Sequence, residues 1–269
     1  MTRTTVDRRE PARPRAFTLV ELLVVVAILS LLMAILLPVV GKARVIARRV
    51  ACTGKLEQIA LGYTMYLNES RGWFYGDNQN LQNPLSTYGG WPGKSLEVGL
   101  RPLNAYLGLP VQDAGEEQAT LFRCPADNDP LETEYGSVYR DLGNSYKANY
   151  ILVSPRFLSV TLANPWRTIN QRIRTYGVAK REIVFQPSRM LLLGDFPWMS
   201  QWDPNNDKCT GWHGRRHYHN MAFLDGHAAF TEIIRGRYDV DGSYRIQPHK
   251  EADRTISELQ QRVLCKCEK

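Results

Sequence analysis

The sequence predicts an α+β protein in which a long N-terminal helix packs on a globular domain built on an antiparallel β-sheet. Three observations carry this prediction. An apolar stretch at residues 22–40 leads into a stripe of apolar residues at helical spacing. Two short apolar runs within residues 181–195 have the length of buried strands. Two further apolar runs flank Asp225-Gly226, a dipeptide typical of tight hairpin turns.

The apolar stretch at residues 22–40 carries no charged side chain, and only Ser30 and Pro38 interrupt the hydrocarbon. A membrane-spanning helix needs about 20 such residues. A cleaved secretory signal has an apolar core of about 7–15 residues followed by a small-x-small cleavage site. This run is longer and continues into the basic segment GKARVIARR. We therefore expect a spanning helix and not a removed secretory signal.

Glu21 stands at the start of this stretch and does not suit a plain membrane anchor. An acidic side chain in lipid costs on the order of 3 kcal/mol even on a lenient scale. Such a residue requires a partner and indicates a function.

The letters FTLVEL at residues 17–22, behind a basic leader, resemble the N-terminus of type IV prepilins and type II secretion pseudopilins. The resemblance implies that a prepilin peptidase cuts between Ala16 and Phe17 and that the new N-terminus of Phe17 is methylated. Glu21 then becomes the fifth residue of the mature chain, and Pro38 lies at the position of the family's proline. Ala16 departs from the family, which usually has Gly before the cut.

The resemblance also supplies a partner for Glu21. In an assembling filament its carboxylate can pair with the Phe17 amine of a neighbouring subunit, so that two groups costly alone in lipid satisfy each other. The implied protein is a structural subunit without enzymatic activity or cofactor. Its implied partners are the prepilin peptidase, other pilin or pseudopilin subunits and inner-membrane lipid, and its domain lies on the periplasmic or extracytoplasmic side. Whether the apparatus serves secretion, a pilus or DNA uptake stays open.

The net charge of +7 does not indicate nucleic-acid binding. Residues 1–50 hold nine Lys or Arg and three Asp or Glu, a net of +6, and residues 51–269 hold 25 against 24, a net of +1. The basic character therefore belongs to the leader and to the flank of the apolar stretch. Basic residues lie on both sides of that stretch, so charge alone does not decide its orientation.

The helix is expected to continue to residue 68, with a kink at Pro38 and turn residues at 68–72. Its second half should pack on the domain through one stripe at helical spacing, formed by Leu56, Ile59, Ala60, Tyr63 and Leu67. The expected organisation is a leader at 1–16, a pilin helix at 17–68 and an exported domain at 69–269.

Within the domain, residues 76–130 are rich in Asn, Gly and Pro and predict loops with short helices. REIVFQP at 181–187 and RMLLLGD at 189–195 predict buried strands. The segment at 219–233 predicts a β-hairpin with a two-residue type I′ turn at Asp225-Gly226.

Four short pieces of the domain extend the resemblance: CPAD at 124–127, SYKANY at 145–150, PSRMLLLGD at 187–195 and HNMAFLDGHAAF at 219–230. In this order they are similar to large-domain pilin-like proteins whose C-terminal region is named for a His, nine residues and Asp-Gly. Arg215 stands where that His would be, with His213 and His217 on either side.

Four of the five histidines fall within residues 213–227. His217, His219 and Asp225 form a candidate divalent-metal site, because residues 217 and 219 would share one face of a strand and imidazole and carboxylate are zinc ligands. An ordinary hairpin with surface histidines is the other interpretation, and the spacing fits no established zinc motif. A metal site here would favour an alternative function, a membrane-tethered metal-dependent binding protein or enzyme.

The five cysteines leave at least one thiol outside any intramolecular pair. A disulfide between Cys209 and Cys265 or Cys267 of the tail is one possibility, and a metal clip of Cys209, His213 and the tail is another.

Overall fold

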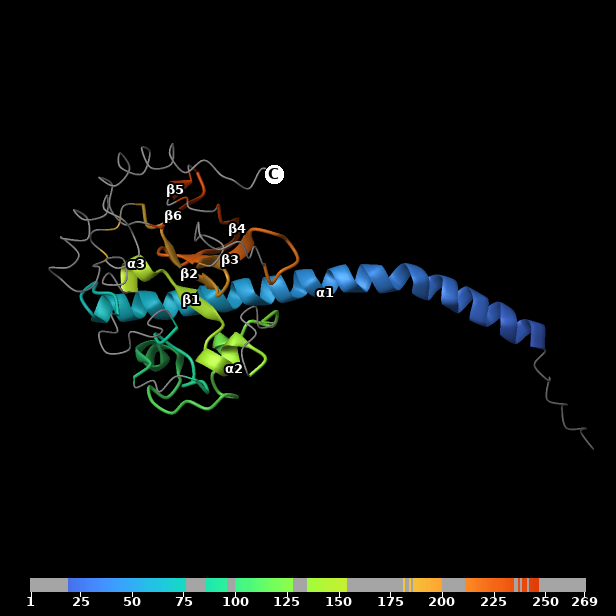
Figure 1. Cartoon of the computed structure of the whole chain (residues 1–269), viewed down its shortest axis with the longest axis horizontal. Helices are drawn as coiled ribbons and strands as arrows, with labels where there is room; N and C mark the ends of the chain where they lie inside the picture. The colour runs from blue at the N-terminus through green and yellow to red at the C-terminus, as the bar shows by residue number, and fades with distance from the viewer. Residues whose placement is uncertain are drawn as a thin grey trace, which may run out of the picture. The chain divides into compact units, whose positions relative to one another are not determined.

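The computed structural model of the chain describes residues 19–75, 86–95, 100–127, 135–153, 181, 184, 186–199, 211–234, 237, 239–240 and 242–246. The chain divides into two compact units, Met1–Arg44 and Val45–Lys269. The expected α+β class is confirmed, because a long N-terminal helix is accompanied by a domain with a four-stranded antiparallel sheet (Figure 1).

Helix α1 spans Leu19–Glu69 and contains Pro38 within its length. The kink expected at Pro38 stays a prediction. The helix ends one residue beyond the expected position. The amide of Gly72 donates to the carbonyl of Leu67 at 2.6 Å, and Arg71 adopts a left-handed φ of 54°. This is the geometry of a Schellman C-cap, which turns the chain away from the helix axis.

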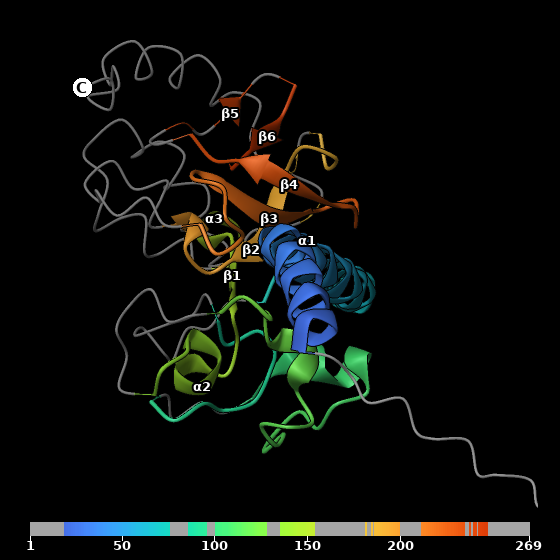
Figure 2. The ribbon, with the colours of Figure 1, turned by 90° about the vertical axis from the view of Figure 1, so that its right-hand side faces the viewer.

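The second half of α1 lies along the sheet of the second unit, beside β2 and β3 (Figure 2). Its buried face confirms the stripe expected from the sequence and extends it one turn further, to Cys52. Aromatic rings from the domain meet this face. The ring of Tyr63 is 5.4 Å from that of Tyr88, which in turn lies 6.1 Å from Phe122. The helix is therefore part of the core of the domain.

The main sheet has the strand order β1-β2-β3-β4, with every neighbouring pair antiparallel. Its strands are β1 (Tyr146–Ala148), β2 (Leu191–Asp195), β3 (Tyr218–Phe223) and β4 (Ala228–Glu232). All five residues of β2 and five of the six residues of β3 are buried. Consecutive buried residues point to opposite faces of a strand, so both faces of these central strands are covered. The strand expected at 189–195 and the hairpin are thus present.

The turn of the hairpin differs from the expected type. Phe223 accepts from the amide of Gly226 at 3.0 Å and donates to the carbonyl of His227 at 2.9 Å, which leaves three residues in the loop. Gly226 has φ of 100°, whereas Asp225 is not among the residues with positive φ. A type I′ turn needs positive φ at both central residues. The chain instead follows the three-residue hairpin pattern, in which a glycine closes the loop.

Short elements complete the described part of the domain: η1 (Pro102–Leu107), η2 (Thr120–Phe122), α2 (Val138–Leu142), α3 (Tyr150–Val153), and a two-stranded sheet of β5 (Asp239–Val240) and β6 (Tyr244–Arg245). Three residues of the strand expected at 181–187, at 182, 183 and 185, lie outside the described residues. Those of its residues that are described, at 181, 184, 186 and 187, belong to no strand.

Candidate functional site

The first half of α1 presents apolar side chains on its surface. Every residue from 19 to 48 is exposed, and the helix is long and apolar enough to cross a membrane. Glu21 lies in the first turn of this helix. Ala16 and Phe17, the residues of the expected cut, lie outside the described residues.

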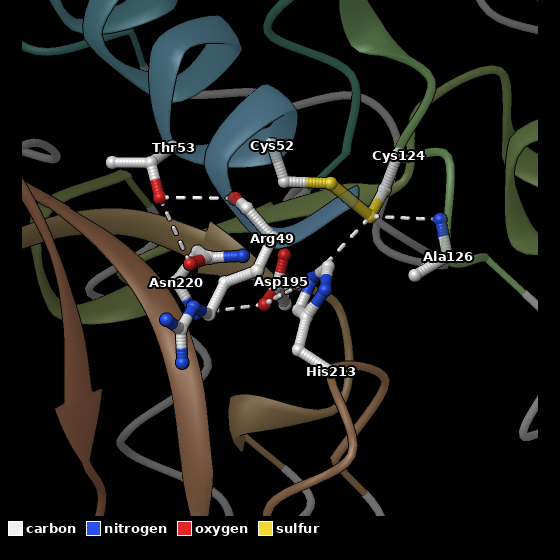
Figure 3. A network of polar contacts seen from close by, with 8 residues as sticks. All are labelled: Arg49, Cys52, Thr53, Cys124, Ala126, Asp195, His213 and Asn220. Atoms are coloured by element: carbon white, nitrogen blue, oxygen red, sulfur yellow. Dashed lines mark hydrogen bonds and ion pairs between the residues drawn. A yellow bond between two sulfur atoms is a disulfide. The ribbon is translucent and has the colours of Figure 1, made fainter. Parts of the chain in front are cut away.

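A second feature is buried in the domain. Cys52, on the buried face of α1, forms a disulfide with Cys124 in the loop after η2 (Figure 3). The two cysteines are separated by 72 residues of sequence. The amide of Ala126 donates to Cys124 Sγ at 3.4 Å and orients the loop around the sulfur. The disulfide therefore attaches the helix to the domain covalently.

Two further polar side chains meet these sulfurs. His213 precedes β3, and its Nε2 lies 3.6 Å from Cys124 Sγ and 3.2 Å from Asp195 Oδ2. Asp195 is the last residue of β2, and its Oδ2 also accepts from the backbone amide of Asn220 at 2.7 Å. The side chains of His213 and Asp195 have no exposed surface. Burying such groups is costly unless they are bonded, so their meeting point is a specific polar centre.

We call Cys52, Cys124, Asp195 and His213 the buried centre. The donor atoms of these four side chains all lie within 4.8 Å of one another. Within the described part of the chain, this is the group of three or more His, Cys, Asp or Glu side chains that satisfies this condition. Asp195 Oδ1 and His213 Nδ1 have no hydrogen-bond partner among the described residues.

Polar contacts hold α1 over the buried centre. Thr53 Oγ1 lies 3.0 Å from Asn220 Oδ1 on β3. Lys55 Nζ donates to the carbonyl of Thr120, the first residue of η2, at 2.6 Å and to that of Arg123, which follows η2, at 2.8 Å. The guanidinium of Arg49 lies 4.7 Å from the ring centre of Phe230 on β4. The helix is thus fixed on both sides of Cys52.

Comparison with known proteins points to the N-terminal helix. A family model described as the prokaryotic N-terminal methylation motif matches residues 12–37. The chain carries a prepilin-type N-terminus. The match covers the last five residues of the leader, the junction of Ala16 and Phe17, and Glu21. No curated protein and no solved structure matches the chain.

Behind this prepilin-type N-terminus, the four sequence pieces of the domain are joined by hydrogen bonds, and two of them contribute residues to the buried centre. CPAD contributes Cys124 and Asp127, whose carboxylate accepts from the amides of Val138 and Tyr139, at the start of α2, and from Ser145 Oγ of SYKANY. The piece at 187–195 ends in Asp195, and the piece at 219–230 contains the residue whose amide binds that carboxylate. The polar residues of these four pieces therefore hold one local structure together through their hydrogen bonds.

His219 is buried in β3, and neither of its ring nitrogens has a hydrogen-bond partner among the described residues. Burial lowers the pKa of His219 to about 4, against the opposing influence of Asp195. Removal from water therefore disfavours the charged imidazole in the folded protein.

The candidate metal site of His217, His219 and Asp225 is not among the close donor groups of the described residues. His217 has φ of 67° and precedes β3, so the expected alternation of residues 217 and 219 on one strand is wrong. Asp225 lies in the exposed hairpin turn, where its Oδ1 is 2.6 Å from Nδ1 of His227. The turn carboxylate thus binds its own loop.

The disulfide expected from the sequence joins Cys209 to a cysteine of the tail, whereas the structure pairs Cys52 with Cys124. Cys209, Cys265 and Cys267 lie outside the described residues. The pair of Cys52 and Cys124 was missed, although Cys52 precedes Leu56 by one helical turn and shares its apolar face. That spacing was the available signal for a buried cysteine on α1.

Proposed function

We propose that this chain is a prepilin-like structural subunit of a type II secretion or type IV pilus-like apparatus. The methylation motif at residues 12–37 carries the proposal. In this proposal a prepilin peptidase removes residues 1–16 and the amine of Phe17 is methylated. The mature subunit then assembles with other pilin or pseudopilin subunits through its N-terminal helix, and no catalytic activity is assigned to it.

The exposed apolar surface of α1 supports assembly through this helix. Leu22, Ile28, Leu32 and Leu36 are each about half exposed or more, as are their neighbours along the stretch. Contiguous apolar surface of this extent marks a membrane or protein contact. Lipid covers it before assembly, and the helices of other subunits cover it afterwards. The helix and the motif fit a single-pass membrane protein.

The disulfide between Cys52 and Cys124 supports an extracytoplasmic position for the domain. Disulfides persist in oxidising compartments and are rare in the bacterial cytosol. The same orientation follows from the prepilin resemblance, with the leader inside and the domain outside.

The domain further resembles the large-domain pilin-like group named for a His, nine residues and Asp-Gly. Here His213 lies twelve residues before Asp225, two more than in that pattern, and it reaches the buried centre. We propose that His213 occupies the place of the family histidine. The size of the domain favours a minor or specialised subunit over a bulk filament subunit.

The test is the N-terminus of the protein isolated from its native host. N-terminal mass spectrometry should find a mature chain that begins at an N-methylated Phe17. An intact start at Met1 or Thr2, or a cut beyond residue 40, would contradict the proposal and leave a simple membrane anchor.

A pair of leader variants sharpens this test. Ala16→Glu places a large charged residue at the cut and should leave the leader attached. Arg13→Lys keeps the charge of the leader and should be processed like the wild type. Both residues precede the folded domain, so an effect on domain folding cannot account for a difference between the two variants.

A further inference from the structure

His213 contacts a disulfide and Asp195 lies close to it, although the disulfide requires neither of them. A disulfide bond is complete with its two sulfurs. Yet a carboxylate from β2 and an imidazole from the segment before β3 are both fully buried beside it. Unpaired polar atoms in a protein interior cost free energy and are uncommon in native structures. The buried centre therefore has a donor set that exceeds the needs of a disulfide.

The donor set is that of a zinc site. Two cysteine sulfurs, one imidazole nitrogen and one carboxylate oxygen are all ligand types that Zn²⁺ takes in tetrahedral sites. Zinc bonds of about 2.0–2.1 Å to nitrogen or oxygen and about 2.3 Å to sulfur place neighbouring donors about 3.3–3.8 Å apart.

The buried centre has donor distances of this size. His213 Nε2 is 3.2 Å from Asp195 Oδ2 and 3.6 Å from Cys124 Sγ. All four donors lie within 4.8 Å of one another. Asp195 Oδ1 has no hydrogen-bond partner among the described residues, so this carboxylate has a second oxygen that no hydrogen bond engages. The bonded sulfurs of Cys52 and Cys124 would need to separate to about 3.8 Å to complete the tetrahedron.

We propose that the reduced form of this protein binds one zinc ion at the buried centre, with Cys52, Cys124, His213 and Asp195 as its ligands. The proposal concerns how the domain is held together and is independent of the proposed assembly function. Zinc binding and the disulfide exclude each other, because the metal ligand is the thiolate.

The chemistry connects the two forms. Newly made cysteines are thiols, and each releases one proton when its sulfur binds zinc. Oxidation by a disulfide- or quinone-class acceptor removes two electrons from the two sulfurs, forms the S–S bond and frees the zinc ion. In both forms Cys52 and Cys124 stay joined, so α1 is attached to the domain in reducing and in oxidising compartments alike.

The experiment uses the full chain in detergent micelles, with Cys209, Cys265 and Cys267 replaced by Ser so that two cysteines remain. A phosphine reduces the disulfide, taking up oxygen from water and leaving two thiols. After a chelator has removed metal, Co²⁺ is added without air and then displaced by Zn²⁺. We expect about one equivalent of bound cobalt with thiolate charge-transfer bands and the intense d–d bands of a tetrahedral site, lost on adding about one equivalent of zinc.

Single variants assign the two other ligands. His213→Gln and Asp195→Asn each keep both thiols and should weaken cobalt binding by more than about tenfold, because losing outer-shell partners alone costs about 10–100-fold. The control is His227→Gln, which removes an exposed histidine of the same hairpin and should leave the titration unchanged. The unreduced protein should show no thiolate band.

Every other result overturns the proposal. Circular dichroism reports whether the reduced chain is folded. A folded reduced chain without the tetrahedral thiolate spectrum would exclude the site, and so would a reduced chain that unfolds and is not restored by zinc. A cobalt spectrum that survives unchanged in both His213→Gln and Asp195→Asn would place the metal elsewhere.

Discussion

Cys52 and Cys124 join the amphipathic half of α1 to the loop after η2, across 72 residues of sequence. The contacts of Thr53 and Lys55 hold the same turn of the helix against β3 and η2. A pull on the N-terminal helix of an assembled subunit would thus reach the domain through a covalent bond as well as through packing. Stability of the domain should depend strongly on this connection.

Replacing Cys52→Ser and Cys124→Ser together should lower the free energy of unfolding of the oxidised protein by about 4 kcal/mol. Restricting a loop of this length in the unfolded chain accounts for that magnitude. Denaturant unfolding in chelator measures it, with the phosphine-reduced wild type as the matched control. Equal midpoints for the oxidised wild type and the double variant would show that the bond does not stabilise the domain.

Glu21→Val should leave membrane insertion intact or slightly improved, because a charge is removed from lipid. The cut after Ala16 should persist, since the leader and the small residue are unchanged. Crosslinking to partner subunits, at equal membrane levels, should fall more than about tenfold if Glu21 pairs with the Phe17 amine of a neighbour, because the variant removes one partner of that ion pair. Ser30→Val removes a polar group from the same stretch and should assemble normally. Full incorporation of the Glu21→Val variant would show that assembly does not depend on Glu21.

Arg101→Met should lower the free energy of unfolding by about 2–5 kcal/mol. The Arg101 guanidinium is buried and donates to four backbone carbonyls, those of Ser86, Gly89, Pro92 and Leu142. Its burial lowers the pKa of Arg101 to about 10, so it stays charged at neutral pH. In the variant, the carbonyls of Ser86 and Gly89 keep a bond from Asn144, whereas those of Pro92 and Leu142 lose the bond from Arg101.

The matched control for Arg101→Met is Arg140→Met. Arg140 is exposed and pairs with Glu116 at 3.1 Å on the surface. Such a pair contributes about 0–1 kcal/mol. Thermal or denaturant unfolding of the two variants should therefore differ clearly, and equal stabilities would mean that the carbonyl cluster does not depend on Arg101.

Stability should rise with pH between about 4 and 6.5 because of His219. Its pKa is about 4 in the folded protein and ordinarily 6.5, so the unfolded chain binds the additional proton in that range. The contribution is fully present above pH 6.5 and is lost as the pH falls towards 4, with a slope of up to about 1.4 kcal/mol per pH unit.

His219→Leu should flatten this pH dependence, since the variant has no imidazole to protonate. The exposed His227→Leu should retain the wild-type slope. Denaturant unfolding at several pH values from 5 to 7 provides the measurement. A slope unchanged in His219→Leu would assign the pH dependence to other groups.

Several features follow from the sequence alone because they depend on local composition and short-range spacing. The absence of charge at residues 22–40 predicts the membrane-capable helix, and the resemblance of FTLVEL at 17–22 to prepilins predicts the methylation motif. The spacing of Leu56, Ile59 and Tyr63 predicts the buried face of α1, and the apolar runs around Asp225-Gly226 predict the hairpin.

Other features needed the tertiary structure. The φ of Asp225, which is not positive, decides the type of the hairpin turn. The positive φ of His217 keeps this residue out of strand β3, which begins at Tyr218. The residue type alone predicts neither angle. The buried centre draws its four side chains from α1, from the loop after η2, from β2 and from the segment before β3. The sequence does not show which cysteine, histidine or aspartate residues will meet when they are so far apart along the chain. Only the packing of α1 against the sheet brings these donors together, because contacts between distant segments are decided by the fold as a whole.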